Sequence, residues 1–419
     1  MRGWTAGRFG LLQNVNLRRL WLSEIAASAA ESLGLIGLPL LIYDMTDSAR
    51  MIGLITLLLI LPRVLVSPVT GLLADNMDRK RLMMFGMLIR VVFVGLIPLT
   101  SEIWQVALLT VGLSIGNAIS RPAEMSALPA IAGGALLVRA LSLLQVTNGV
   151  IRIAVPAAGA ALIAISGPKA IFWLQAIAFA MAALALRRLT VPGTGKHLSM
   201  RKILGSARSE MWAGIDAVRS VPIVRGITAT ESLFQLVMGA MVVAAVVYTE
   251  ETLNLGNRAE TAFALMSTAV SIGAVLGAIL ASRIERRIGR RRMLAIGYLG
   301  PLFLVPALLA PGMPVIYVAW FCFGFTDALA VISFQAYLAE AIPADLRGRV
   351  YAAWGALVSL AASLAFPIVG FITPILGAPW TFGVIGLLVG MGGPFLLWQT
   401  GALHSIRHHV PVDDLAVAV

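Results

Sequence analysis

The sequence predicts an all-α membrane protein in which twelve transmembrane helices form two six-helix halves. Its 419 residues are 59% hydrophobic and only 12% charged, with a mean hydropathy of +0.90. Soluble domains carry about 25% charged residues. Apolar runs long enough to cross a bilayer, about 20 residues each, recur along the chain, and lysine and arginine gather in alternate links between them. Together these observations argue against a soluble fold.

The apolar runs account for most of the chain, and the links between them are short except at residues 190–221. We therefore expect an N-terminal bundle at 1–189, a linker at 190–221, a C-terminal bundle at 222–400 and a tail at 401–419. The linker places Ile203, Trp212, Ile215 and Val218 among basic residues, which predicts an amphipathic helix at the membrane surface. The expected spans are 18–43, 49–74, 82–100, 104–129, 138–165, 170–189, 222–249, 260–283, 293–311, 314–341, 349–373 and 378–400.

The basic residues predict the sidedness of these spans. The side that holds both termini and the linker receives 25 of the 32 Lys and Arg residues, the other side receives 3, and 4 lie inside spans. The positive-inside rule places the basic side in the cytoplasm, so we expect a multi-pass protein of the cell inner membrane with both termini cytoplasmic. This distribution explains the net charge of +12 without nucleic acid as a partner.

A charged segment, GLLADNMDRKR at residues 71–81, separates the second span from the third. Gly71 lets the end of the second span approach a neighbour closely. Asp75 can accept hydrogen bonds from a helix N-terminus or pair with a nearby arginine. We expect a conformational latch that holds the two halves together in one state; the other reading is a solvated basic turn that only sets topology. This loop latch comprises Gly71, Asp75, Asp78, Arg79 and Arg81.

This charged segment resembles the signature loop of the major facilitator superfamily, Gly-x3-Asp-(Arg/Lys)-x-Gly-x-(Arg/Lys)-(Arg/Lys). Asn76 stands where a base is usual and Asp78 where glycine is usual. Residues 281–294, ASRIERRIGRRRML, repeat the end of the signature between the eighth and ninth spans, but Arg286 occupies the Asp75 position, so the acidic half of the motif is absent there. The resemblance implies two pseudo-symmetric bundles of the major facilitator fold, around a central cavity that opens alternately to each side.

Longer stretches are similar to one branch of that superfamily, the drug–proton antiporters that include macrolide efflux proteins and the enterobactin exporter, with lysophospholipid transporters as relatives. They are NLRRLWLSEIAASAAESLGLIGLPLLIYDMT, RALSLLQVTNGVIRIAVPAAGAAL and AIPADLRGRVYAA. Ala30-Glu31 stands where branch members often have Gly-Asp. Val155-Pro156 stands where exporters often have Gly-Pro, so the direction of transport stays open.

Charged residues inside the predicted spans form the candidate site. A charge in the hydrocarbon core costs at least about 2.5–3.5 kcal/mol, so such residues usually face a cavity. Glu24 and Glu31 lie seven residues apart, on one face of the first span. Arg121 resembles the fourth-span arginine of superfamily antiporters. We predict that Arg121 and Arg152 are the charge partners of Glu31, in a proton-coupling network of Glu24, Glu31, Arg121, Glu124 and Arg152.

A second group of residues is predicted to line a substrate cavity. The buried arginines either neutralise carboxylates or bind an anionic substrate such as a phosphate or catecholate, and static pairing is the alternative to both. Arg90, eight residues into its span, is expected to reach the cytoplasmic interface. The predicted cavity residues are Arg63, Glu231, Phe234, Gln235, Phe323 and Asp327.

Glycines four residues apart predict close helix contacts. Such pairs occur in the fourth, eighth and twelfth spans and allow backbones to approach one another. The pairs are Gly112 and Gly116, Gly273 and Gly277, and Gly386 and Gly390.

These features favour a secondary transporter over other classes. There is no phosphate-cradling Gly-x4-Gly-Lys-(Ser/Thr) motif, no catalytic constellation and no metal-ligand spacing, so we expect no enzyme activity, no metal and no cofactor. All four histidines lie in predicted cytoplasmic segments, which leaves carboxylates as proton carriers. We expect a monomer that uses the proton gradient to export a hydrophobic or amphipathic small molecule such as a drug or siderophore. A lysophospholipid flippase independent of the gradient is the alternative, and a sensor or channel is less favoured.

Overall fold

The computed structural model describes residues 13–167, 169–191, 212, 215, 216, 218–309, 312–342 and 347–400. The surroundings of some residues within these helices, among them Gly71, Asp75 and Arg152, lie outside the description, as does most of the predicted linker helix. The chain divides into two compact units. The first comprises Met1–Met51, Ile55–Ala207 and Phe263–Thr268; the second comprises Ile52–Leu54, Arg208–Ala262 and Ala269–Val419.

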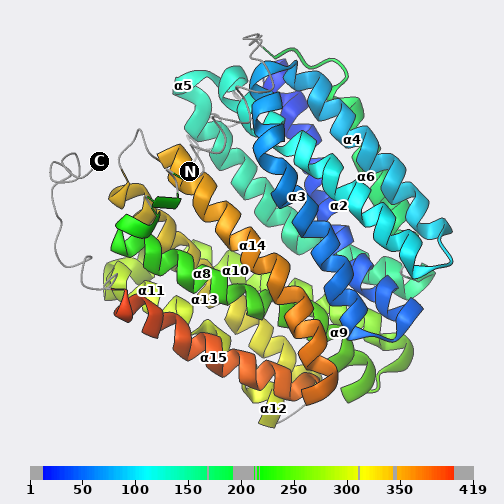
Figure 1. The fold of residues 1–419 in the computed structure, drawn as a ribbon, viewed down its shortest axis with the longest axis vertical. Helices are drawn as coiled ribbons and strands as arrows, with labels where there is room; N and C mark the ends of the chain where they lie inside the picture. The colour runs from blue at the N-terminus through cyan, green and yellow to red at the C-terminus, as the bar shows by residue number, and fades with distance from the viewer. Residues whose placement is uncertain are drawn as a thin grey trace. The chain divides into compact units, whose positions relative to one another are not determined.

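The first unit is built on α2, which packs against both α5 and α6, while α4 packs against the same two helices (Figure 1). Asn14 caps α2 by accepting hydrogen bonds from the backbone N–H groups of Asn16 and Leu17. Pro98 ends α4 in a short 3-10 turn. The elements are α2 (Val15–Thr46), α3 (Ala49–Asn76), α4 (Arg79–Leu96), η1 (Ile97–Leu99), α5 (Ile103–Ser166) and α6 (Lys169–Leu186).

The fourth and fifth expected spans form one continuous helix, α5, of 64 residues. A straight helix of that length would measure about 96 Å, far more than a bilayer. Contacts with α2 show that α5 reverses direction. Ile131 bonds to Asn14 and Asn117 to Glu31, whereas Thr147 bonds to Trp21 and Gly159 lies beside Leu33. The first arm is therefore antiparallel to α2 and the second is parallel to it.

The gap expected between the spans 104–129 and 138–165 is therefore helical in the structure. The stretch contains Pro129, Gly133 and Gly134, and proline and glycine are residues at which helices usually bend.

In the second unit, α8 packs between α14 and α15, and α11 packs against α13 (Figure 1). The expected span 222–249 is interrupted by two π-helical turns, and π turns are frequently found at functional sites. The expected span 293–311 contains a 3-10 segment at Pro301. The elements are α8 (Pro222–Gly239), η2 (Ala240–Ala244), α9 (Ala245–Val247), η3 (Tyr248–Thr252), η4 (Gly256–Arg258), α10 (Ala259–Ile288), α11 (Arg290–Tyr298), η5 (Gly300–Leu304), α12 (Pro306–Leu309), α13 (Met313–Ala341), α14 (Arg347–Leu376) and α15 (Ala378–Gln399).

Glycine brings α10 and α13 into backbone contact. A Cβ built on Gly273 would lie 2.0 Å from the carbonyl oxygen of Phe321, and one built on Gly324 would lie 2.0 Å from that of Val270. Any larger residue would force the two helices apart. The Gly273–Gly277 pair thus makes the close contact that its spacing predicts.

Within the described residues, eleven helical stretches are long and apolar enough to cross a membrane. A twelfth, shorter apolar stretch at Thr147–Ile163 coincides with the fifth expected span, in the second arm of α5. The described part of the chain is helical, without strands. The prediction of an all-α membrane protein is confirmed.

Candidate functional site

Glu31 lies at the centre of a charged group in the first unit. Arg90 on α4 donates a hydrogen bond from Nη2 to Glu31 Oε1 at 2.7 Å, and Asn117 on α5 donates to the same oxygen at 3.1 Å. The side chain of Arg90 is 3% exposed and that of Glu31 is 43% exposed. The pair therefore joins a buried cation to a carboxylate that remains accessible.

Arg90 is held on all sides by the first unit. Its guanidinium lies 3.9 Å from the centre of the Phe179 ring on α6, a favourable cation–π arrangement. A Cβ added to Gly116 on α5 would lie 2.8 Å from Cγ of Arg90, so glycine makes room for the arginine. The prediction that Arg90 reaches the cytoplasmic interface is wrong, because the side chain turns inward to Glu31.

Arg121 pairs with two other carboxylates. Its Nη1 donates to Oε1 and Oε2 of Glu24 at 3.1 and 3.2 Å, and to Oε2 of Glu124 at 3.4 Å. The sequence predicted Arg121 as a charge partner of Glu31, but the residue that binds Glu31 directly is Arg90. Arg121 acts on Glu31 only at longer range. Glu24 and Glu31 were predicted to lie on one face of their helix, and this explains why both bind arginines on neighbouring helices.

Two predicted arginines stand apart from these pairs. Arg63 on α3 is exposed, and only its backbone N–H makes a hydrogen bond that the structure describes, to Ser114 Oγ at 3.1 Å. Its charge acts on Glu31 at longer range. The side chain of Arg152 lies outside the described residues, so its predicted role stays a prediction.

In the second unit, Glu231 on α8 accepts a hydrogen bond from the hydroxyl of Tyr298 at 2.7 Å. Phe234, one turn along α8, stacks on Phe323 with ring centres 5.5 Å apart and meets Tyr298 edge-on at 6.0 Å. The charge of Asp327 on α13 also acts on Glu231. Three of the predicted cavity residues, Glu231, Phe234 and Phe323, therefore lie together around a tyrosine that the sequence did not single out.

Tyr298 was missed because a tyrosine near the end of an apolar run usually lies at the membrane interface. Its hydroxyl is instead buried against a carboxylate. Gln235 is half-buried on α8, next to Phe234.

The loop latch is described only in part, because the surroundings of Gly71 and the side chain of Asp75 lie outside the description. Asp78 caps α4, accepting a hydrogen bond from the backbone N–H of Arg81 at 3.1 Å, and the two side chains form an exposed pair at 3.8 Å. Arg79 reaches across to α5, where it donates to the carbonyl oxygen of Ser126 at 3.1 Å.

The related charged segment in the second unit, residues 281–294, contains an acid that pairs with one of its arginines. Glu285 accepts a hydrogen bond from Nε of Arg290 at 2.7 Å, across the turn made by Gly289 at φ 82°. Arg286 occupies the Asp75 position, as the sequence shows, and the acid that pairs with Arg290 stands one residue earlier, at Glu285.

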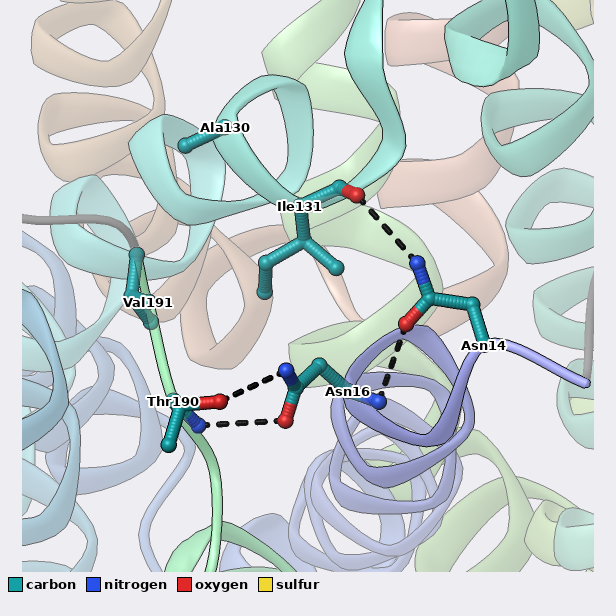
Figure 2. A pocket seen from close by; sticks show the side chains of 6 residues that line it. All are labelled: Asn14, Asn16, Ala130, Ile131, Thr190 and Val191. Atoms are coloured by element: carbon teal, nitrogen blue, oxygen red, sulfur yellow. Dashed lines mark hydrogen bonds between the residues drawn. The ribbon is translucent and has the colours of Figure 1, made fainter.

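A cavity of about 280 Å³ lies at the N-terminal end of α2, away from these charges along the helix (Figure 2). Asn16 and Thr190 exchange two hydrogen bonds there, at 2.6 and 3.1 Å, and Asn14 donates to the carbonyl oxygen of Ile131 at 3.4 Å. These polar groups satisfy one another and fasten the end of the first unit's last helix to its first. In the described residues, no group of His, Cys, Asp and Glu is placed to hold a metal.

Comparison with known families decides the wider identity of the chain. The Major Facilitator Superfamily model matches residues 20–267 and 257–409. The chain belongs to the Major Facilitator Superfamily. It is a multi-pass membrane transporter and not an enzyme, as the sequence predicted. The superfamily's transporters act on small molecules, so the charged groups above belong to a transport protein.

Two relatives within the superfamily are efflux proteins. The chain is 27% identical to the multidrug efflux pump Tap of Mycolicibacterium fortuitum, covering 89% of this chain and 94% of that protein. It is 25% identical to the enterobactin exporter EntS of Salmonella paratyphi A, covering 91% and 92%. The predicted resemblance to drug and siderophore exporters is confirmed.

A solved structure supports the superfamily fold. The nucleoside transporter NupG shares 13% identity with this chain and superposes with a TM-score of 0.69, over 93% of this chain and 98% of NupG. At this identity the likeness concerns the fold alone.

Proposed function

We propose that this protein is a proton-coupled exporter of a hydrophobic or amphipathic small molecule. Protons moving into the cell drive the molecule outward by alternating access, across an inner membrane with both termini in the cytoplasm. Similarity to a multidrug pump and a siderophore exporter supports the direction and the substrate class. The excess of basic residues on one side supports the orientation.

The geometry of Glu31 carries the proposal. A proton carrier must be reachable from water and must change the protein's energy when its charge changes. Glu31 is half-exposed, yet its ion partner Arg90 is buried between α2, α4, α5 and α6. Protonation of Glu31 leaves that guanidinium without its counter-charge, which is unfavourable in a low-dielectric interior. A conformation that solvates or re-pairs Arg90 is then favoured, and this links proton binding to structural change.

The test is proton-driven transport by purified protein in liposomes, with ethidium and doxorubicin as probes. We expect the wild type to move at least one probe against its gradient when a proton gradient is imposed. Glu31→Gln keeps an oxygen that can accept from Arg90 but cannot titrate, so gradient-driven accumulation should be lost while exchange of probe between the two sides persists.

Asp44→Asn is the matched control, because Asp44 is an exposed carboxylate at the far end of the same helix. It should transport like the wild type. Proton-driven accumulation at the wild-type rate in Glu31→Gln would reject the role given to this residue.

A second candidate function is a lysophospholipid flippase that works without the gradient. The observation in its favour is Arg63, an exposed guanidinium in a membrane helix that forms no ion pair with another described residue. Such a group suits a lipid with an anionic head. Transport of fluorescent lysophosphatidylglycerol that survives collapse of the proton gradient, and is lost selectively in Arg63→Gln, would favour this function over export.

A further inference from the structure

A single guanidinium nitrogen in the first unit serves two carboxylates. Nη1 of Arg121 lies 3.1 Å from Glu24 Oε1 and 3.4 Å from Glu124 Oε2. Glu24 interacts more strongly with this nitrogen than Glu124 does, because both of its oxygens accept hydrogen bonds from it. Glu124 receives one long hydrogen bond. Its other oxygen, Oε1, is buried without a hydrogen-bond partner among the described residues, and its side chain is only 4% exposed.

The neighbouring charged residues do not supply the hydrogen bond that Glu124 Oε1 lacks. On α2 the second acid, Glu31, is already bound to Arg90 of α4 at 2.7 Å. Those two groups act on Glu124 only at longer range and with opposite signs. The triad of Glu24, Arg121 and Glu124 therefore has two acids and one base. With both acids ionised it would hold a net negative charge, and an ionised oxygen without a donor is among the most costly groups to bury.

We propose that Glu124 binds a proton in this conformation, at a site separate from Glu31. The proton comes from water and forms an O–H bond at the carboxyl group of Glu124, and no other bond changes. The triad is then neutral overall, with Glu24 ionised and paired to Arg121. This inference rests on the proposed function only for its purpose, since a proton site inside a membrane span is useful to a proton-driven transporter.

The arrangement also gives Arg121 a way to release this proton. When Glu24 is protonated or moves away, the guanidinium is free to pair fully with Glu124, which then ionises. Asn117, Arg121 and Glu124 lie at intervals of four and three residues on one face of α5. Asn117 binds Glu31, so one helix face connects the two proton sites. Transport would thus involve one proton on Glu31 of α2 and a second on Glu124 of α5.

The proton on Glu124 is measurable without any substrate or gradient. A protonated buried carboxyl group gives an infrared carbonyl stretch that shifts when the sample is moved into heavy water. We expect purified wild-type protein at neutral pH to show this band, and Glu31→Gln and Asp44→Asn to keep it. Glu124→Gln should lose this band at neutral pH.

Glu24→Gln provides an independent test that keeps Glu124 in place. It leaves Arg121 to Glu124 alone, so Glu124 should ionise. The band should disappear at neutral pH and return on acidification. Gel filtration and thermal unfolding of each variant verify the fold, and Glu24→Gln alone decides the matter if Glu124→Gln does not fold.

A band that survives in Glu124→Gln, a wild type without the band, or a Glu24→Gln band unchanged at neutral pH would each overturn the proposal. None of these results bears on Glu31, whose role is judged by transport. Failure of the two ideas is therefore distinguishable.

Discussion

At the scale of residues, the pair of Glu31 and Arg90 has two unequal ends. Arg90 is enclosed by α4, α5 and α6, whereas nearly half of the Glu31 side chain is accessible. Removing one member of a buried pair leaves the other uncompensated, and the cost depends on how deeply the remaining charge is buried. The two possible deletions should therefore have different consequences.

We expect Glu31→Ala to lower the free energy of unfolding by about 3–5 kcal/mol, since it leaves the enclosed guanidinium of Arg90 without a carboxylate. Arg90→Met should cost less, because methionine can still pack against Phe179 and the accessible Glu31 keeps its bond to Asn117. Denaturant unfolding in mild detergent measures both. Equal losses, or a larger loss in Arg90→Met, would show that burial of the arginine does not dominate.

The sequence located the ionisable residues of the spans but not their pairing. Glu24, Glu31, Arg121 and Glu124 were identifiable because a charge stands out in an apolar run. Which arginine meets which acid depends on the rotation of each helix about its axis, and apolar residues on every side of a membrane helix leave that rotation undetermined. Arg90 was misplaced for this reason, and Tyr298 was not recognised because a tyrosine in such a run is expected at the membrane interface.

At the scale of elements, the crossing of α10 and α13 depends on the absence of side chains. Gly273 and Gly324 each face a backbone carbonyl of the opposite helix. Between membrane helices there is little hydrophobic driving force, so close packing of this kind supplies much of the association.

We expect Gly273→Ala to destabilise the second unit by about 1–3 kcal/mol, the usual cost of overpacking, because the new methyl group would overlap the carbonyl of Phe321. Gly355→Ala is the matched control. Gly355 is also in a helix, α14, but nothing lies within 4 Å of its Cβ position, so alanine should be neutral or stabilise by up to about 1 kcal/mol. Thermal unfolding of both variants tests this, and equal midpoints would contradict the crossing.

Hydropathy predicted where most helices lie but not how they are interrupted. The positions of α2, α6, α14 and α15 follow from runs of apolar residues with polar or glycine residues at their ends. The two spans expected at 104–129 and 138–165 are joined within α5. The π turns at Ala240–Ala244 and Tyr248–Thr252 both pack against α15, and the first also packs against α14; the hydropathy of the sequence does not predict them.

At the scale of the whole molecule, the distribution of basic residues predicts an orientation that chemical labelling can test. Cys322 is the chain's single cysteine, so Cys322→Ser gives a thiol-free background if it transports like the wild type. In that background we expect Ser101→Cys to react with a membrane-impermeant maleimide on intact cells. Met77→Cys should react only after permeabilisation. Both positions are exposed and lie between helices. The opposite labelling pattern would invert the proposed topology.

The spacing of the paired groups along the chain has a consequence for biosynthesis. Glu31 precedes Arg90 by 59 residues, and Glu24 precedes Arg121 by 97. Because the N-terminal part of a chain is made first, α2 leaves the ribosome with two acids whose partners have not yet been translated. Insertion of these two acids into the membrane costs free energy, which the apolar residues of α2 must offset. This helix therefore acquires its final surroundings only after later helices arrive.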